Sequence, residues 1–423
     1  MRQDLALSSG PRRRLFQAVF VALSLAGVAL AAEVAVRIGG TQDIDGNFFF
    51  RGRHVPPYRI AVSKVQTILH EYGSDSGSYM VFDAHLGWSN RPRSCSRDRL
   101  YCANSEGLRA NRDYPLEPES GGHRVALFGD SFIHGHDVPI QESMAPQVEE
   151  SLSALGSRAD VLNYGVGGYG IDQAFLRYLK EGRSRRFAVV IVGLQLENVA
   201  RAVNVFRIIY HPGTAVPFSK PRFVLKDKKL VLMNDPTVPV GQIVARLAKF
   251  GADPLRHIES FYDHNYTRRW FHVSKLLAIV LDRLQQRNNT QHLQDRLYRS
   301  GSEATNLTLL TLKEFQKAVE ANGSRFFLVY LPTRDRVEAR MHGRSDSTEE
   351  LYREICHRFP VIDPLEDLLG AAKRWGIQDV VPGHYSGRGN RIVAAVIAKR
   401  LKEVLPGSNL KTYRPLRTGM PRW

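Results

Sequence analysis

Short aliphatic runs that alternate with helical stretches constrain the fold of this chain more than any other feature. Residues 124–128, 187–193 and 326–331 are runs of five to seven residues that are almost wholly apolar. Runs of this length and composition indicate strands buried on both faces of a parallel sheet. Because stretches with helical periodicity separate them, we expect an α/β fold with a doubly wound, flavodoxin-like parallel sheet.

The stretches between these runs support the same fold. Met144, Val148 and Leu152 are spaced at i, i+4 and i+8, which predicts one helix with an apolar face. Further strands are expected at residues 160–163 and 361–363, and further helices at residues 173–180, 307–320 and 388–404. We therefore assign residues 121–404 to one α/β domain.

Residues 199–310 interrupt the alternation and read as an insertion in that domain. Residues 222–225, apart from Arg222, and residues 230–233 are apolar and are joined by the four charged residues 226–229, which predicts a hairpin. The clearest helix of the insertion is expected from Trp270 to about Leu284. We expect this insertion to shape a substrate pocket, since Arg201, Arg207, Tyr210 and His211 suit an anionic or sugar ligand.

The N-terminus predicts a membrane segment. Arg12, Arg13 and Arg14 precede an apolar run at residues 15–31. A basic flank before about 17 apolar residues is typical of a signal peptide or of a short anchor. Cleavage after Ala31 is one alternative, but apolar character continues to Ile38, which favours an uncleaved signal anchor over residues 1–39. Since basic flanks stay in the cytoplasm, the rest of the chain is expected outside it, in the periplasm or at the cell surface.

The remaining segments carry less information. Residues 40–120 lack a clear periodicity and are expected to form an irregular extension, and residues 405–423 form a basic tail. Cys95 and Cys102 lie close together in a polar stretch and can pair in an oxidising compartment. The net charge of +17 comes from scattered residues without a nucleic-acid-binding module, so we expect no nucleic-acid partner. The sequence indicates no metal and no cofactor.

Three loops that follow predicted strands carry candidate catalytic or binding residues. In an open parallel sheet such loops meet beyond the carboxyl ends of the strands. Ser131 follows the strand at 124–128 within Gly129-Asp130-Ser131, where a helix N-terminus would favour negative charge. The tripeptide by itself is equally compatible with a capped turn.

The second loop, residues 163–170, is rich in glycine. It matches the G-x-G-x-x-G pattern between a strand and a helix, which is typical of dinucleotide binding. That function requires an acidic residue at the end of the next strand, and residues 187–193 contain none. The glycines instead suit close approach of backbone amides to a ligand, or close packing of helix on strand.

The third loop contains His384, between the last strand and the last helix. Although a lone histidine is more often structural, this one lies at the reactive edge and far from Ser131 in sequence, as a general base often does. His134 and His136 follow Ser131, and we expect them in a solvated turn rather than at a metal.

Together these loops resemble the SGNH/GDSL hydrolase (esterase) family, over roughly residues 120–205 and 325–404. Ser131 matches the nucleophile of that family and His384 its base, while Gly168 and Asn198 match the residues that donate to the oxyanion. The resemblance implies that Ser131 attacks an ester carbonyl, and that the oxyanion is held by the amides of Ser131 and Gly168 and by the Asn198 side chain.

The acid partner of His384 departs from the family pattern. The family places an aspartate two or three residues before the histidine, where this chain has Val381 and Pro382. Asp379 is the nearest acid in sequence and is our candidate. Asp363, at the end of the last strand, and a backbone carbonyl are the alternatives.

The sequence thus predicts a serine esterase that cleaves ester groups, O-acetyl groups in the first place, on an extracytoplasmic carbohydrate or lipid. An O-acetyltransferase acting on a cell-surface polysaccharide would use the same residues, because only the acceptor differs. A non-catalytic binding or assembly module is the third hypothesis, since a fold does not guarantee activity. The missing acid close to His384 keeps this hypothesis open, and a Ser131–His384 separation well beyond about 5 Å would favour it.

Overall fold

The computed structural model describes residues 10–74, 78–118, 122–196, 198–344 and 347–405. The chain forms two compact units, each described by itself below. The N-terminal unit consists of Met1–Ser63 and Tyr262–Gln291, and the sheet unit consists of Lys64–Phe261 and His292–Trp423. The expected basic tail, apart from Leu405, lies outside the described residues.

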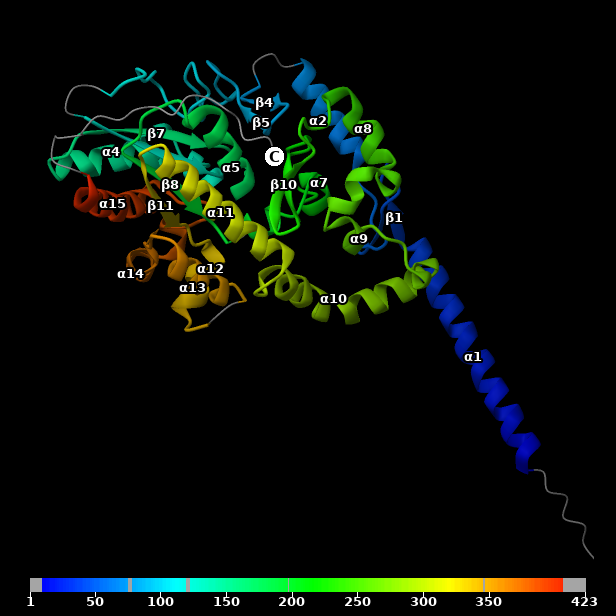
Figure 1. Cartoon of the computed structure of the whole chain (residues 1–423). Helices are drawn as coiled ribbons and strands as arrows, with labels where there is room; N and C mark the ends of the chain where they lie inside the picture. The colour runs from blue at the N-terminus through cyan, green and yellow to red at the C-terminus, as the bar shows by residue number, and fades with distance from the viewer. Residues whose placement is uncertain (1–9, 75–77, 119–121, 197, 345–346, 406–423) are drawn as a thin grey trace, which may run out of the picture. The chain divides into compact units, whose positions relative to one another are not determined.

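A five-stranded parallel sheet is the centre of the sheet unit (Figure 1). Its strand order is β12-β11-β8-β6-β7, so the first strand of the sheet along the chain has its successors on both sides. This is the flavodoxin-like order, and it confirms the predicted fold class. The strands are β6 (His123–Gly129), β7 (Ala159–Gly165), β8 (Val189–Leu194), β11 (Arg325–Tyr330) and β12 (Val361–Ile362).

Helices pack on this sheet in pairs. Helix α4 packs against α15, and α5 packs against α11. Met144, Val148 and Leu152 are fully buried, as their spacing predicts. The helices of this unit are α2 (Val62–Ser74), α3 (Ser131–His134), α4 (Met144–Ala154), α5 (Ile171–Arg177), α6 (Asn198–Arg201), α7 (Arg207–Tyr210), α8 (Val240–Ala248), α11 (Glu303–Ala321), α12 (Arg334–Met341), α13 (Glu349–Arg358), α14 (Leu365–Trp375) and α15 (Gly387–Val404).

The predicted hairpin of the insertion is present as β9 (Arg222–Lys226) and β10 (Lys229–Met233), which pair antiparallel. A second antiparallel pair, β4 (Met80–Asp83) and β5 (Gly87–Asn90), lies in the segment expected to be irregular. That segment also contains the 13-residue helix α2. The N-terminal extension is therefore more regular than its sequence indicates.

The N-terminal unit combines the start of the chain with part of the insertion. Helix α1 (Gly10–Ile38) is followed by a small antiparallel sheet, and the beginning of α10 (Lys275–Tyr298) packs on both. The sheet consists of β1 (Gly40–Gln42), β2 (Phe48–Phe50) and β3 (Arg53–Val55), and a short helix α9 (Tyr262–Asn265) precedes α10. Among the described residues one helical stretch, Arg13–Ile38, is long and apolar enough to cross a membrane, with a mean hydropathy of 2.3.

Candidate active site

Ser131 lies where the sheet order reverses. Strand β6 has β7 on one side and β8 on the other, and Ser131 begins α3 two residues after β6 ends. Crevices at such switch points are where open α/β sheets bind ligands. Gly129 has a φ of +158°, and a Cβ there would lie 2.7 Å from the Ile133 side chain. The tight turn that presents Ser131 therefore requires glycine at this position.

Asp130 fixes the turn from the buried side. Its carboxylate accepts a hydrogen bond of 2.9 Å from the Phe132 amide and so caps α3. The other carboxylate oxygen accepts from Arg201 Nη1 at 3.0 Å. Asp130 and Arg201 are 1% and 4% exposed, so this is a buried ion pair. Removing one partner of such a pair leaves a buried charge uncompensated.

His384 lies against Ser131, as the sequence predicts. His384 Nε2 and Ser131 Oγ are 2.9 Å apart, although the two residues are separated by 253 positions in the chain. The His384 ring rests on Phe132, with a centroid distance of 5.0 Å, and its own side chain is about one quarter exposed. This distance is within the range over which a general base takes the proton of a serine hydroxyl.

The acid that contacts His384 is Asp137, not Asp379. Asp137 Oδ2 lies 2.7 Å from His384 Nδ1. An Nδ1–H that donates to Asp137 leaves Nε2 free to accept the Ser131 proton, which is the tautomer that a base requires. Asp379 is exposed, and its backbone carbonyl accepts from Ser386 Oγ at 2.6 Å.

The alternative acid, Asp363, is also engaged elsewhere. Its carboxylate accepts from the Tyr352 hydroxyl and from the Leu365 amide. The sequence did not point to Asp137 because the family pattern places the acid close to the histidine in the chain. It comes instead from the turn after the nucleophile helix, six positions beyond Ser131. Its one sequence signal is that an acid so close to the nucleophile can reach the same edge of the sheet.

The turn that carries Asp137 is held by the N-terminal extension. Asp137 has a φ of +67°, an unfavourable backbone conformation for a residue other than glycine. Its amide donates to the Tyr101 hydroxyl at 3.0 Å. The Tyr101 ring stacks on His136, with centroids 5.1 Å apart and planes 19° apart. Tyr101 is itself next to Cys102, which is disulfide-bonded to Cys95, as the sequence allows.

Arg109 connects the disulfide loop with the turn that carries Asp137. This arginine is 2% exposed, and its Nη1 and Nη2 donate to the carbonyls of Leu100 and Val138, each at 2.9 Å. Its guanidinium also lies 4.7 Å from the centroid of the Tyr101 ring. Arg109 therefore bridges the disulfide loop to the residue that follows Asp137.

The two other histidines of this region are not in a solvated turn. His134 is 3% exposed, and its Nε2 lies 2.8 Å from the Tyr79 hydroxyl. Burial, followed by the nearby Arg109 charge, holds the pKa of His134 well below its usual value. His136 is half-buried, and burial together with His384 lowers its pKa as well. The expectation of a solvated turn was wrong because Tyr79 and Tyr101 cover these rings.

The glycine-rich loop packs directly on the nucleophile helix. Asn163 Nδ2 donates to the Ile133 carbonyl at 2.8 Å, and its Oδ1 accepts from the Gly165 amide at 2.9 Å. A Cβ on Gly165 would lie 2.3 Å from the His134 nitrogen, so glycine is required there. Gly168 has a φ of +82°, and its carbonyl accepts from Arg207 at 3.5 Å. Part of this loop thus serves close packing of a helix on a strand, which was one of the two functions expected for its glycines.

Ser131 and His384 open into a cavity of about 710 Å³. Leu196, Arg207 and Arg334 are among its lining residues, and so is Gln195, which follows β8 directly. Gln195 and Asn198 are each 2% exposed, and neither side-chain oxygen has a hydrogen-bond partner among the described residues. Gln195 lines this cavity, whereas Asn198 and Gly168 are not among its described lining residues.

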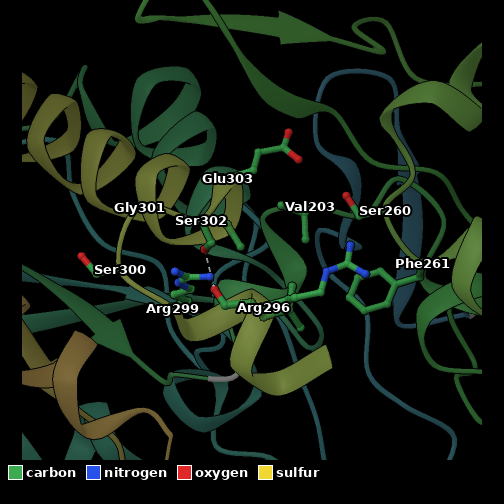
Figure 2. A pocket seen from close by; sticks show the side chains of 11 residues that line it. Val203, Ser260, Phe261, Arg296, Arg299, Ser300, Gly301, Ser302 and Glu303 are labelled. Carbon is green, nitrogen blue, oxygen red and sulfur yellow. Dashed lines mark hydrogen bonds between the residues drawn. The ribbon is translucent and has the colours of Figure 1, made fainter. Parts of the chain in front are cut away.

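A second cavity of the sheet unit, of about 470 Å³, lacks comparable chemistry (Figure 2). It lies at the start of α11, where Ser302 caps the helix through the Thr305 amide. Arg296 and Arg299 also line it, while Glu303 is ion-paired with Arg222. No histidine is among its described lining residues, so the cavity beside Ser131 is the candidate active site.

No family model and no curated protein sequence matches the chain. Solved structures do, at low similarity. The lipase/acylhydrolase from Enterococcus faecalis is 12% identical, with a TM-score of 0.34, over 68% of this chain and 100% of that one. A GDSL-like lipase from Parabacteroides merdae is 11% identical, with a TM-score of 0.35, and the match covers 69% of this chain and 100% of that one. A two-domain esterase active on acetylated mannans is 13% identical, with a TM-score of 0.31, and the match covers 70% of this chain and 53% of that one. Values this low carry no information about activity, so the chemistry is inferred from the geometry around Ser131.

Proposed function

We propose that this chain is a serine esterase in which Ser131, His384 and Asp137 form the catalytic triad. The continuous hydrogen-bonded path from Ser131 Oγ through the His384 ring to the Asp137 carboxylate carries the proposal. Nucleophile, base and orienting acid within hydrogen-bond reach are the signature of an activated serine. The 2.9 Å between Ser131 Oγ and His384 Nε2 argues against the non-catalytic binding module, which a wide separation would favour.

The proposed reaction is acyl transfer in two steps. His384 accepts the hydroxyl proton as Ser131 Oγ attacks the ester carbonyl, and Asp137 stabilises the imidazolium that forms. His384 then gives the proton to the leaving alkoxide, which departs as the alcohol and leaves an acyl-serine. Water, deprotonated by His384, attacks the acyl-serine and releases the carboxylic acid. Ser131 regains its proton from His384, so the enzyme ends unchanged.

The oxyanion of each tetrahedral intermediate needs donors beyond the Ser131 amide at the start of α3. We propose that a buried carboxamide at the end of β8 supplies one and that Gly168 supplies a further amide. Gln195 and Asn198 are the two candidates for the carboxamide. Gln195→Ala and Asn198→Ala separate them, since loss of the true donor lowers kcat by about 10²- to 10³-fold. The other variant should change kcat far less.

A serine-directed fluorophosphonate probe tests the proposal as a whole. We expect the probe to label the wild type and Ser153→Ala, a control at an exposed serine of α4, but not Ser131→Ala. Hydrolysis of a chromogenic acetyl ester should follow the same pattern. Absence of labelling and of ester turnover in the wild type would overturn the esterase proposal.

A transferase is the second candidate, because the same acyl-serine can be attacked by a sugar hydroxyl in place of water. The cavity beside Ser131 is large enough for more than an acetyl group, and this favours keeping the alternative. Free acetate and acetylated glycan, measured together after adding a cell-surface polysaccharide as acceptor, discriminate the two. Acetate alone supports the hydrolase, and acetylated glycan supports the transferase.

We further propose that α1 anchors the chain in a membrane, with the sheet unit on the extracytoplasmic side and an ester-bearing carbohydrate or lipid as substrate. The helix continues past the potential cleavage site at Ala31, and its last turn is part of the folded N-terminal unit. Val36 is buried with Phe48, Val55 and Ala278. This packing favours retention of the helix, and the mass of the mature protein tests it.

A further inference from the structure

The end of α1 is joined rigidly to the segment that precedes α10. The Glu33 carboxylate accepts hydrogen bonds from Ser274 Oγ and from the amides of Lys275 and Leu276, at 2.8 to 2.9 Å. It therefore caps α10 from a different helix. Arg37 Nη2 donates to the Val273 carbonyl at 2.9 Å. These bonds hold the segment beside the last turn of α1, where the apolar stretch of that helix ends.

This short segment exposes two apolar side chains while it buries a histidine. In the turn Trp270–Val273, the two middle residues, Phe271 and His272, are buried at 6% and 8% exposure. The two outer residues point away from the unit, with Trp270 78% and Val273 67% exposed. Ile38, the last residue of α1, is 81% exposed. Single exposed apolar residues are ordinary, but here three lie at the end of α1 and in the segment bonded to it, where their exposure to water is unfavourable.

Cations surround the same surface. Arg268 and Arg269 are exposed directly before Trp270, and the Arg37 side chain is about half exposed. Burial, followed by the charges of Arg37, Arg268 and Arg59, lowers the pKa of Lys275. Tryptophan is enriched at membrane interfaces, and Lys and Arg side chains near an anionic surface are attracted to it.

We propose that Ile38, Trp270 and Val273, with Arg37, Arg268 and Arg269, form an interfacial patch that binds the anionic headgroup region of the membrane. The proposal rests on the membrane anchoring proposed above, and it goes beyond it. An anchor alone leaves the tilt of the N-terminal unit against the bilayer unset, whereas the patch fixes this unit against the bilayer surface. Trp270 and Val273 would enter the upper acyl region while the arginines contact phosphates.

Tryptophan fluorescence of the full chain in lipid nanodiscs tests the patch. The discs contain phosphatidylcholine with or without phosphatidylglycerol, and either plain or brominated acyl chains, because bromine quenches tryptophan only on close approach. Trp270→Phe is compared with Trp375→Phe, a matched change at an exposed tryptophan of the sheet unit. We expect brominated lipid to quench the wild type and Trp375→Phe, and to leave Trp270→Phe almost unquenched.

A double variant, Arg268→Gln with Arg269→Gln, tests the charge of the patch. It should lose the extra quenching that phosphatidylglycerol produces over phosphatidylcholine alone. The patch would be overturned if brominated lipid quenched Trp270→Phe and the wild type equally. It would also be overturned if brominated lipid did not quench the wild type.

Two controls keep the outcomes separate. Flotation of Trp270→Phe with vesicles through α1 shows that the anchor survives without the patch. Turnover of a soluble ester in detergent reports the esterase alone, and we expect it unchanged in all patch variants. Loss of ester turnover in the wild type would therefore contradict the proposed function without touching the patch.

Discussion

The two sides of the nucleophile helix carry the same kinds of side chain in opposite environments. On the buried side lie Asp130, ion-paired with Arg201, and His134, bonded to Tyr79. On the exposed side lie Asp137 and His384, which are bonded to each other. The Asp130 side chain is 1% exposed and the Asp137 side chain 61%.

The difference in burial separates a residue that supports the fold, Asp130, from a residue proposed to take part in the reaction, Asp137. Asp130 has two strong partners inside the fold, so it fixes the backbone of the turn that presents Ser131. Asp137 faces solvent, where its attraction to a histidine is screened, and its position depends on Tyr101 and Arg109. We therefore expect changes on the buried side to lower the free energy of unfolding, and changes on the exposed side to lower the rate.

Asp130→Ala should produce the largest effect on stability. It removes a helix cap and leaves the Arg201 guanidinium buried without its carboxylate. Breaking a buried pair in this way typically lowers the free energy of unfolding by about 3–5 kcal/mol. Asp137→Ala is the matched change on the exposed side and should lower it by less than about 1 kcal/mol. Urea unfolding of both variants checks this, and equal losses would remove the distinction between the two sides.

His134 should make the stability depend on pH. Because its pKa is well below the ordinary value of 6.5 in the folded chain, the unfolded chain binds a proton first as the pH falls. Stability is therefore lost below about pH 6.5, by at most about 1.4 kcal/mol per pH unit for this one proton. The denaturation midpoints of wild type and His134→Gln, followed from about pH 7.5 to about pH 5, should converge on the acid side. Parallel curves would contradict a neutral, buried His134.

Tyr101→Phe should have the smallest effect. It removes the hydroxyl that accepts from the Asp137 amide, a hydrogen bond worth about 0.5–1.5 kcal/mol. We expect kcat to fall by about two- to tenfold with KM unchanged, because Tyr101 positions Asp137 and does not touch the substrate. The pH profile of kcat should shift as well as its maximum falling, and a purely structural loss would not shift the profile. Tyr114→Phe, at a partly buried tyrosine of the same extension, is the control and should leave kcat unchanged.

The fold was predictable because it depends on local pattern. The apolar runs at β6, β8 and β11 can only be buried strands, and their alternation with helices admits few topologies. The proximity of Ser131 and His384 was predictable for the same reason, since each follows its own strand; their catalytic roles stay a proposal. Asp137 was not, because its position depends on a left-handed turn held by Tyr101 and Arg109, and no local pattern records those long-range contacts.

The joining of residues 262–291 with the start of the chain escaped prediction in the same way. It depends on Glu33 capping α10, across more than 240 positions in sequence. The apolar contacts of Val36 with Ala278 are equally long-range. The boundaries expected for the domain and its insertion stay predictions.

The central claim is that Asp137 orients His384, and one comparison of rates tests it most directly. Asp137→Asn and Asp379→Asn are assayed side by side on the same acetyl ester. We predict that Asp137→Asn lowers kcat by about 10²-fold, less than the roughly 10⁴-fold known for a buried triad acid because Asp137 is exposed. Asp379→Asn should retain the wild-type rate. A wild-type rate in Asp137→Asn together with a large loss in Asp379→Asn would contradict the triad proposed here.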